Sequence, residues 1–141
     1  MLFDVNVVLA LHIRKHPHHA VATEWFARLG SAGETFGVPL PVWHSFVRLA
    51  TNHRVNKPPE TLAEVFGFVD RMTRQGGYRR IEAGPRHLQV FREVCLAALA
   101  RENLVPDAVL AAIAIENGAT VASFDRDFAR FPNLRWIVPG E

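Results

Sequence analysis

Short apolar segments alternate along this chain with longer segments in which apolar residues recur at every third or fourth position. The short segments have the length of buried strands, and the longer ones have the periodicity of helices that bury one face. Strands separated by helices favour a parallel sheet with helices on both of its faces. We therefore predict an α/β fold, a single three-layer α/β/α domain over residues 1–141 with a mainly parallel central sheet.

The individual elements follow from the same patterns. The expected strands are 1–3, 35–38, 78–81, 119–124 and 136–138. The expected helices are 5–11, 22–29, 41–51, 62–69, 88–98 and 106–117. The last of these helices is apolar on nearly every side and is followed by Gly118, so we expect it to be buried and to end there.

Composition excludes several classes of protein. The lone cysteine, Cys95, excludes an internal disulfide framework and a cysteine-rich zinc site, and is typical of a cytoplasmic protein. The longest apolar run covers residues 108–115, which is too short to span a membrane. The net charge of +2 does not by itself indicate a nucleic-acid partner, but it is unevenly spread: residues 1–100 carry +4 and residues 101–141 carry −2.

Three aspartates lie at the ends of predicted apolar elements. Asp4 follows the first strand, Asp125 follows the strand at 119–124, and Asp107 opens the buried helix. Ligands of an open parallel sheet bind beyond the carboxyl ends of the strands. Charges beside apolar sequence are costly unless they are compensated, and Mg²⁺ or Mn²⁺ would compensate them. Such an ion can also activate water for attack on a phosphodiester.

Each aspartate taken singly also fits a purely structural role. Asp107 suits the first turn of a helix, where the helix dipole favours negative charge. Asp125 suits a helix cap or an Asx-turn, and Asp4 suits an N-cap or a turn. The three together are better evidence for a metal site than any one of them alone, but their spacing does not show that they converge.

Several stretches have a familiar order and spacing along the chain. They are residues 2–9, Trp43, residues 48–55, 103–119 and 123–128, Phe131 and residues 134–136. Over nearly its whole length the chain thus resembles the PIN-domain ribonucleases, and in particular the VapC-type toxins of toxin–antitoxin pairs.

The resemblance implies a function and a set of site residues. It implies a metal-dependent endoribonuclease that cleaves RNA with Mg²⁺, or Mn²⁺, at a catalytic and metal-binding site formed by Asp4, Asp107 and Asp125. It also implies a cognate antitoxin and a homodimer, which would form a heterotetramer or a larger assembly with that antitoxin. Further candidates are Asn6, which would orient the first aspartate, and Arg48 and Arg54 as RNA-binding residues. Asp127 is a candidate for an additional ligand or for a group just outside the ligands, although a solvated turn residue fits this position better.

One position departs from the family pattern. Many members carry a glutamate three residues before the arginine that matches Arg48, and here that position is Ser45. A hydroxyl is a weaker ligand for a hard cation than a carboxylate, so we expect weaker metal binding, with one well-held ion in place of two. The alternative function is therefore a catalytically weakened module that binds RNA or the antitoxin without cutting.

Other features leave alternatives open. The cations near the end of the helix at 41–51 suit either RNA phosphates or a solvated helix end. The motif at 16–19, His-Pro-His-His, is more typical of a polar loop than of a metal site. A phosphatase with Asp4 as the nucleophile is disfavoured, because Asn6 stands where such a motif would need its second aspartate.

Overall fold

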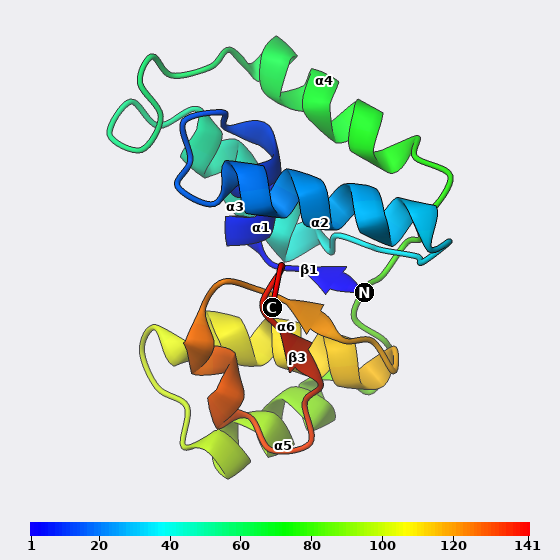
Figure 1. The fold of residues 1–141 in the computed structure, drawn as a ribbon. Helices are drawn as coiled ribbons and strands as arrows, with labels where there is room; N and C mark the ends of the chain where they lie inside the picture. Colours follow the sequence, from blue (N-terminus) through cyan, green and yellow to red (C-terminus); the bar gives the residue numbers. More distant parts are fainter.

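The computed structural model describes residues 1–141. Six α-helices, three strands and one 3₁₀-helix, η1, follow one another along the chain (Figure 1). In order they are β1 Leu2–Phe3, α1 Val5–His12, α2 His19–Ser31, α3 Leu40–Ala50, α4 Leu62–Thr73, α5 His87–Ala98, α6 Leu104–Glu116, β2 Val121–Ala122, η1 Arg126–Arg130 and β3 Trp136–Ile137.

The three strands form one parallel sheet in the order β1-β2-β3. Leu2 pairs with Val121, and Val121 pairs in turn with Trp136. In Figure 1, α1 to α4 lie above β1, whereas α6 lies level with β2 and β3 and α5 lies below them. The predicted three-layer arrangement and the parallel sheet are confirmed.

Two of the predicted strands do not form in the structure. The segment at 35–38 contributes only single bridges, from Gly37 to Leu2 and from Phe36 to Tyr78, and the segment at 78–81 contributes only the second of these. The first segment cannot extend further, because Pro39 lacks the N–H that a ladder needs and instead begins α3 as its N-cap. These bridges nevertheless widen the sheet beyond β1.

Helix α6 forms the buried centre of the lower layer. It begins at Leu104, before the expected start at Pro106, because proline fits the first turn of a helix as well as its first residue. Alanines fill much of its buried surface, which lets α6 approach both the sheet and α5 closely. The buried residues are Leu104, Ala108, Leu110, Ala111, Ala112, Ile113 and Ala114.

The parallel sheet determines where the functional groups meet. All of its strands end at one edge, so the residues that follow β1 and β2 lie next to each other there. No helix in the structure has the length and apolar character that crossing a membrane requires.

Gly37 offers a test of the widened sheet. A Cβ at this position would lie 2.5 Å from the carbonyl oxygen of Arg79 and 2.5 Å from a methyl carbon of Ile81. We expect Gly37→Ala to lower the free energy of unfolding by about 1–3 kcal/mol, measured by urea denaturation. Gly30→Ala is the control: its new methyl group meets no atom within 4 Å in helix α2, so it should raise stability by about 0.5–1 kcal/mol. Equal urea midpoints for Gly37→Ala and the wild type would show that the contact is absent.

Candidate active site

Asp4 lies at the junction between β1 and α1 and is only 5% exposed. One carboxylate oxygen accepts from the backbone N–H of Val5 at 2.6 Å. The other accepts from the side-chain amide of Asn6 at 2.8 Å and from the hydroxyl of Ser123 at 2.7 Å. Asp4 therefore caps α1, as one interpretation of the sequence held, and at the same time faces the end of β2. Burial raises its pKa, and the charge of Asp125 raises it further, whereas its hydrogen bonds oppose the rise.

Ser123 joins the two halves of the site. Its buried hydroxyl donates to Asp4 and accepts from the amide of Asn6 at 2.9 Å and from the backbone N–H of Asp125 at 3.0 Å. Asn6 completes the network by accepting from the N–H of Phe124 at 3.1 Å. Together these bonds fix the start of α1 against the chain that leaves β2.

Asp125 and Asp127 lie on that same segment and are exposed. Asp125 is the N-cap of η1, and its carboxylate accepts from the N–H of Asp127 at 2.9 Å. As with Asp4, the capping role and a place beside the other carboxylates occur together. The structure thus supports the capping interpretation without removing Asp125 from the site.

Asp107 lies in the first turn of α6 and is half-buried. Its pKa is raised to about 7, first by burial and then by the charges of Asp4, Asp125 and Asp127. A carboxyl group perturbed in this way by like charges marks a functional site more often than a structural one. The predicted site residues Asp4, Asp107 and Asp125 therefore act on one another electrostatically.

Hard oxygen donors of this kind suit Mg²⁺ or Mn²⁺, and a cation would relieve both the mutual repulsion and the burial cost. The carboxylates are nevertheless too far apart to share one ion. No three aspartate, glutamate, histidine or cysteine side chains lie close enough together to bind the same metal ion. The donor set fits a divalent cation in chemistry, and binding would require the carboxylates to move closer together.

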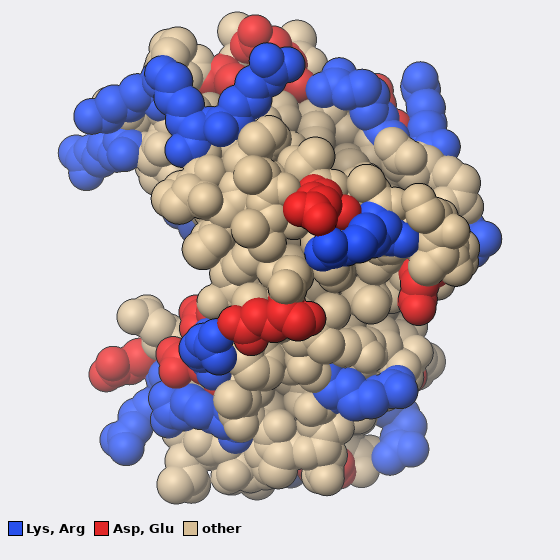
Figure 2. All heavy atoms as spheres, in the orientation of Figure 1, with Lys and Arg blue, Asp and Glu red and all other residues tan.

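The other predicted residues lie on α3 and on the segment after it. Ser45 is half-buried and makes no side-chain hydrogen bond, whereas Arg48 and Arg54 are exposed and form no ion pair. In Figure 2, Lys and Arg side chains gather at the upper left, over the region between α3 and α4 and the loop between α1 and α2 in Figure 1. A notch separates this upper part from the lower layer, and acidic atoms lie along its lower side (Figure 2).

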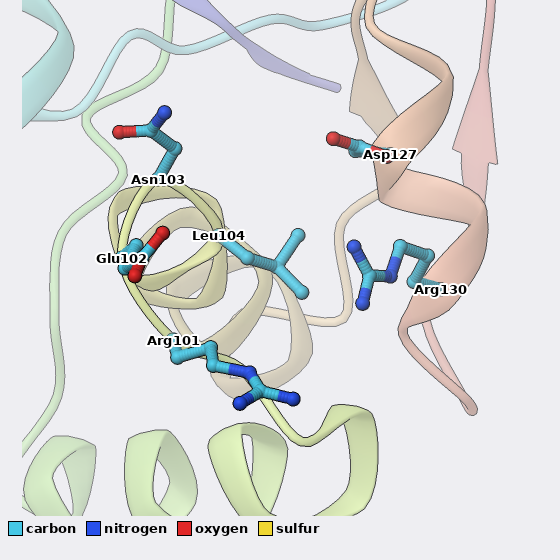
Figure 3. Close-up of a pocket in the computed structure, with 6 residues that line it drawn as sticks. All are labelled: Arg101, Glu102, Asn103, Leu104, Asp127 and Arg130. Carbon is cyan, nitrogen blue, oxygen red and sulfur yellow. The ribbon is translucent and has the colours of Figure 1, made fainter.

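A pocket of about 400 Å³ opens beside Asp127 (Figure 3). Asn103, at the start of α6, lies on one side of it, and Asp127 and Arg130 point toward it from η1. Arg101 supplies a second guanidinium. The pocket thus places two guanidinium groups near the Asp127 carboxylate. The sequence had suggested no cations at this place.

Ser123 is the main residue that sequence reasoning missed. It lies in the stretch 123–128, in which only Asp125 and Asp127 were predicted as site residues. The available signal was a polar residue at the end of an apolar strand, since a buried hydroxyl in such a place needs partners. Arg101 and Arg130 were also missed, because they flank the site only after α6 and η1 pack together.

The protein is an α/β domain with a cluster of carboxylates at the carboxyl edge of its parallel sheet, packed against the alanine-rich helix α6. Residues 1–134 match the PIN domain family. The chain belongs to that family, as its resemblance indicated.

Relatives and solved structures agree with this assignment. The chain is 49% identical to Ribonuclease VapC31 of Mycobacterium tuberculosis over 138 residues, covering 98% of this chain and 97% of the relative. It is 47% identical to Ribonuclease VapC25 of the same organism over the same shares of the two chains. The fold is similar to that of VapBC-1 from nontypeable Haemophilus influenzae, with a TM-score of 0.73 at 11% identity, covering 99% of this chain and 98% of that one.

Ser123→Ala tests the network that joins the two halves of the site. The substitution removes a donor from the buried Asp4 and an acceptor from the N–H of Asp125. We expect a loss of about 1–3 kcal/mol in the free energy of unfolding, measured by urea denaturation. Ser31→Ala is the matched control, because its exposed hydroxyl bonds only within its own helix, and it should change stability by less than about 0.5 kcal/mol. Similar losses for the two variants would contradict the assigned role.

The raised pKa of Asp107 predicts how stability depends on pH. Between its ordinary value of 3.8 and about 7, the folded protein holds a proton that the unfolded chain releases. Stability from this group is therefore full below that window and is lost as pH rises through it. Asp107→Asn removes the effect.

The measurement is urea denaturation of both proteins in EDTA across the same pH window. We expect Asp107→Asn to be increasingly more stable than the wild type as pH rises, up to a constant difference above neutrality. A difference that does not change with pH would show that Asp107 titrates at its ordinary value.

Proposed function

We propose that this protein is a divalent-metal-dependent endoribonuclease that acts as the toxin of a VapBC-type toxin–antitoxin pair. The observation that carries the proposal is the cluster of like charges around Asp107, whose pKa is raised to about 7, beside a buried Asp4 that protein donors hold in place. Two relatives that are nearly half identical over the whole chain are named ribonucleases, which supports the same activity.

Asp4, Asp107 and Asp125 are the residues proposed to hold Mg²⁺ or Mn²⁺, with Asp127 as an additional ligand. When bound, such an ion lowers the pKa of water and offsets charge that develops on a phosphodiester. Ser123 and Asn6 hold the Asp4 carboxylate in a fixed orientation. In the proposed hydrolysis, water adds to phosphorus and one P–O ester bond breaks, which leaves one phosphate end and one hydroxyl end. A carboxylate of the cluster accepts the proton of the attacking water.

RNA binding is assigned to cations on both sides of the acidic cluster. Arg48 and Arg54 lie on and after α3, and their charges are unpaired. Arg101 and Arg130 line the pocket beside Asp127. Backbone phosphates supply most of the affinity for such surfaces, so binding should weaken as salt rises.

Protein partners belong to the same proposal. Solved structures with this fold include the VapBC2 complex of Rickettsia felis, at a TM-score of 0.72 and 16% identity, covering 97% of this chain and 96% of that one. We infer a cognate antitoxin, and a homodimer that binds it as a heterotetramer or larger assembly in the cytoplasm. Two helices leave large apolar side chains exposed, which is typical of interaction surfaces. They are Leu62 and Phe66 on α4, and Leu88 and Leu96 on α5.

RNA cleavage by the purified protein tests the activity. We expect cleavage with Mg²⁺ or Mn²⁺, none in EDTA, and a loss of at least about 100-fold in rate for Asp4→Asn and for Asp107→Asn. Asp70→Asn, an exposed aspartate on α4, is the matched control and should cut like the wild type. Cleavage that persists in EDTA and in both site variants would overturn the proposed mechanism.

A second readout does not depend on activity. Mg²⁺ should raise the melting temperature of the wild type and of Asp70→Asn, but not that of Asp107→Asn. If Mg²⁺ stabilises the wild type while no RNA is cut, the weakened binding module is the better description. In that case Ser45→Glu, which restores the carboxylate of the family pattern, should produce cleavage.

A further inference from the structure

Three histidines lie at the end of the loop between α1 and α2 and at the first residue of α2, and two of them have structural roles. The His16 ring accepts from the backbone N–H of His18 at 3.2 Å. Burial and the two neighbouring histidines lower the pKa of His16, which keeps that ring nitrogen free to accept. His19 donates from its ring to the carbonyl of Ala10 at 2.7 Å. These bonds fix the loop in place and leave the ring of His18 without a hydrogen-bond partner.

His18 is instead stacked on an aromatic ring. Its imidazole lies over the ring of Phe124, with ring centroids 4.2 Å apart and planes inclined by only 10°. His18 is exposed to solvent, whereas Phe124 is half-buried. An exposed imidazole is thus held flat by the ring of Phe124, with the ring of His16 beside it at 5.7 Å and inclined by 46°, and neither of its ring nitrogens makes a hydrogen bond.

The stacked pair adjoins the acidic cluster. Phe124 stands between Ser123 and Asp125, and its own N–H is bound by Asn6 at 3.1 Å. The same short segment therefore carries the hydroxyl that orients Asp4, the ring under His18 and one of the carboxylates. Any shift of Phe124 would disturb the site, so the position of the stack is tied to that of the acidic groups.

Arg14 and Lys15 extend the same loop and are exposed. A flat exposed ring flanked by cations suits single-stranded RNA, whose bases stack on aromatic side chains while its phosphates pair with Lys and Arg. The combination therefore favours a nucleobase as the occupant.

We propose that His18, backed by Phe124, is a stacking platform for a nucleobase of the RNA substrate next to the bond that is cut. The proposal rests on the proposed ribonuclease function and adds a binding subsite to it. His18 acts in binding and takes no part in the chemical step. In the His-Pro-His-His motif, His16 and His19 then hold the backbone in place, and His18 between them contacts the base.

The test separates binding from cleavage. A fluorescent single-stranded RNA of about 12 nucleotides is titrated in EDTA with the Asp107→Asn protein, which is expected to bind without cutting. Adding His18→Ala to this protein should weaken binding about 5- to 100-fold, the range that one base–aromatic stack supplies. Adding His18→Tyr, which keeps a flat ring, should restore most of the affinity. His44→Ala, which removes an exposed histidine on α3 that has no aromatic partner, is the control and should have no effect.

Abasic substitutions in the same RNA locate the contact. One abasic position should weaken binding to the Asp107→Asn protein and have no further effect once His18→Ala is also present. Affinity that is unchanged by His18→Ala, or an abasic effect that persists in that variant, would overturn the platform. Failure of the wild type to cut RNA, while His18→Ala still weakens binding, would overturn the nuclease function and leave the platform standing.

Discussion

The hydrogen bond from Ser123 to Asp4 joins residues that are 119 positions apart, and the rest of the site depends on it. Asp4 is almost completely buried, and a buried carboxylate is unfavourable unless donors surround it. Val5 and Asn6 supply donors from the same end of the chain, and Ser123 supplies the one that reaches across the sheet. Because the same hydroxyl also accepts from the N–H of Asp125, the orientation of the buried group and the path of the exposed segment are set together.

The carboxylate cluster is costly to the stability of the fold. Hydrogen bonds hold Asp4 and Asp125 in place, yet the carboxylates repel one another and raise the pKa of Asp107 to about 7. A chain selected only for stability would have replaced one of them with an amide. Sites that retain such repulsion are typical of proteins whose activity needs a destabilised group, and a bound cation would relieve the cost.

Much of the architecture followed from the sequence, because burial leaves a periodic trace. The helices and the parallel sheet were predicted from apolar spacing. The segments at 35–38 and 78–81 form only single bridges and no strands, because Pro39 ends the pairing between these two segments after one bridge. Asp4, Asp107 and Asp125 were chosen because each interrupts or follows apolar sequence, while their roles as metal ligands stay predictions. Ser123 was missed although it is a polar residue at the end of an apolar strand. The stack of His18 on Phe124 was missed because a contact between distant residues leaves no pattern that spacing can show. The role of Ser45 likewise stays a prediction.

The parallel order of the strands has a consequence during synthesis. Asp4 leaves the ribosome well before Ser123, which lies 119 residues later, on the segment after β2, and holds the Asp4 carboxylate. Until that segment has emerged and paired with β1, Asp4 lacks the hydroxyl that orients it and Asp107 lacks its neighbours. A growing chain therefore has no assembled acidic cluster before that segment has emerged. The topology itself delays the assembly of the acidic cluster until the segment after β2 has been made.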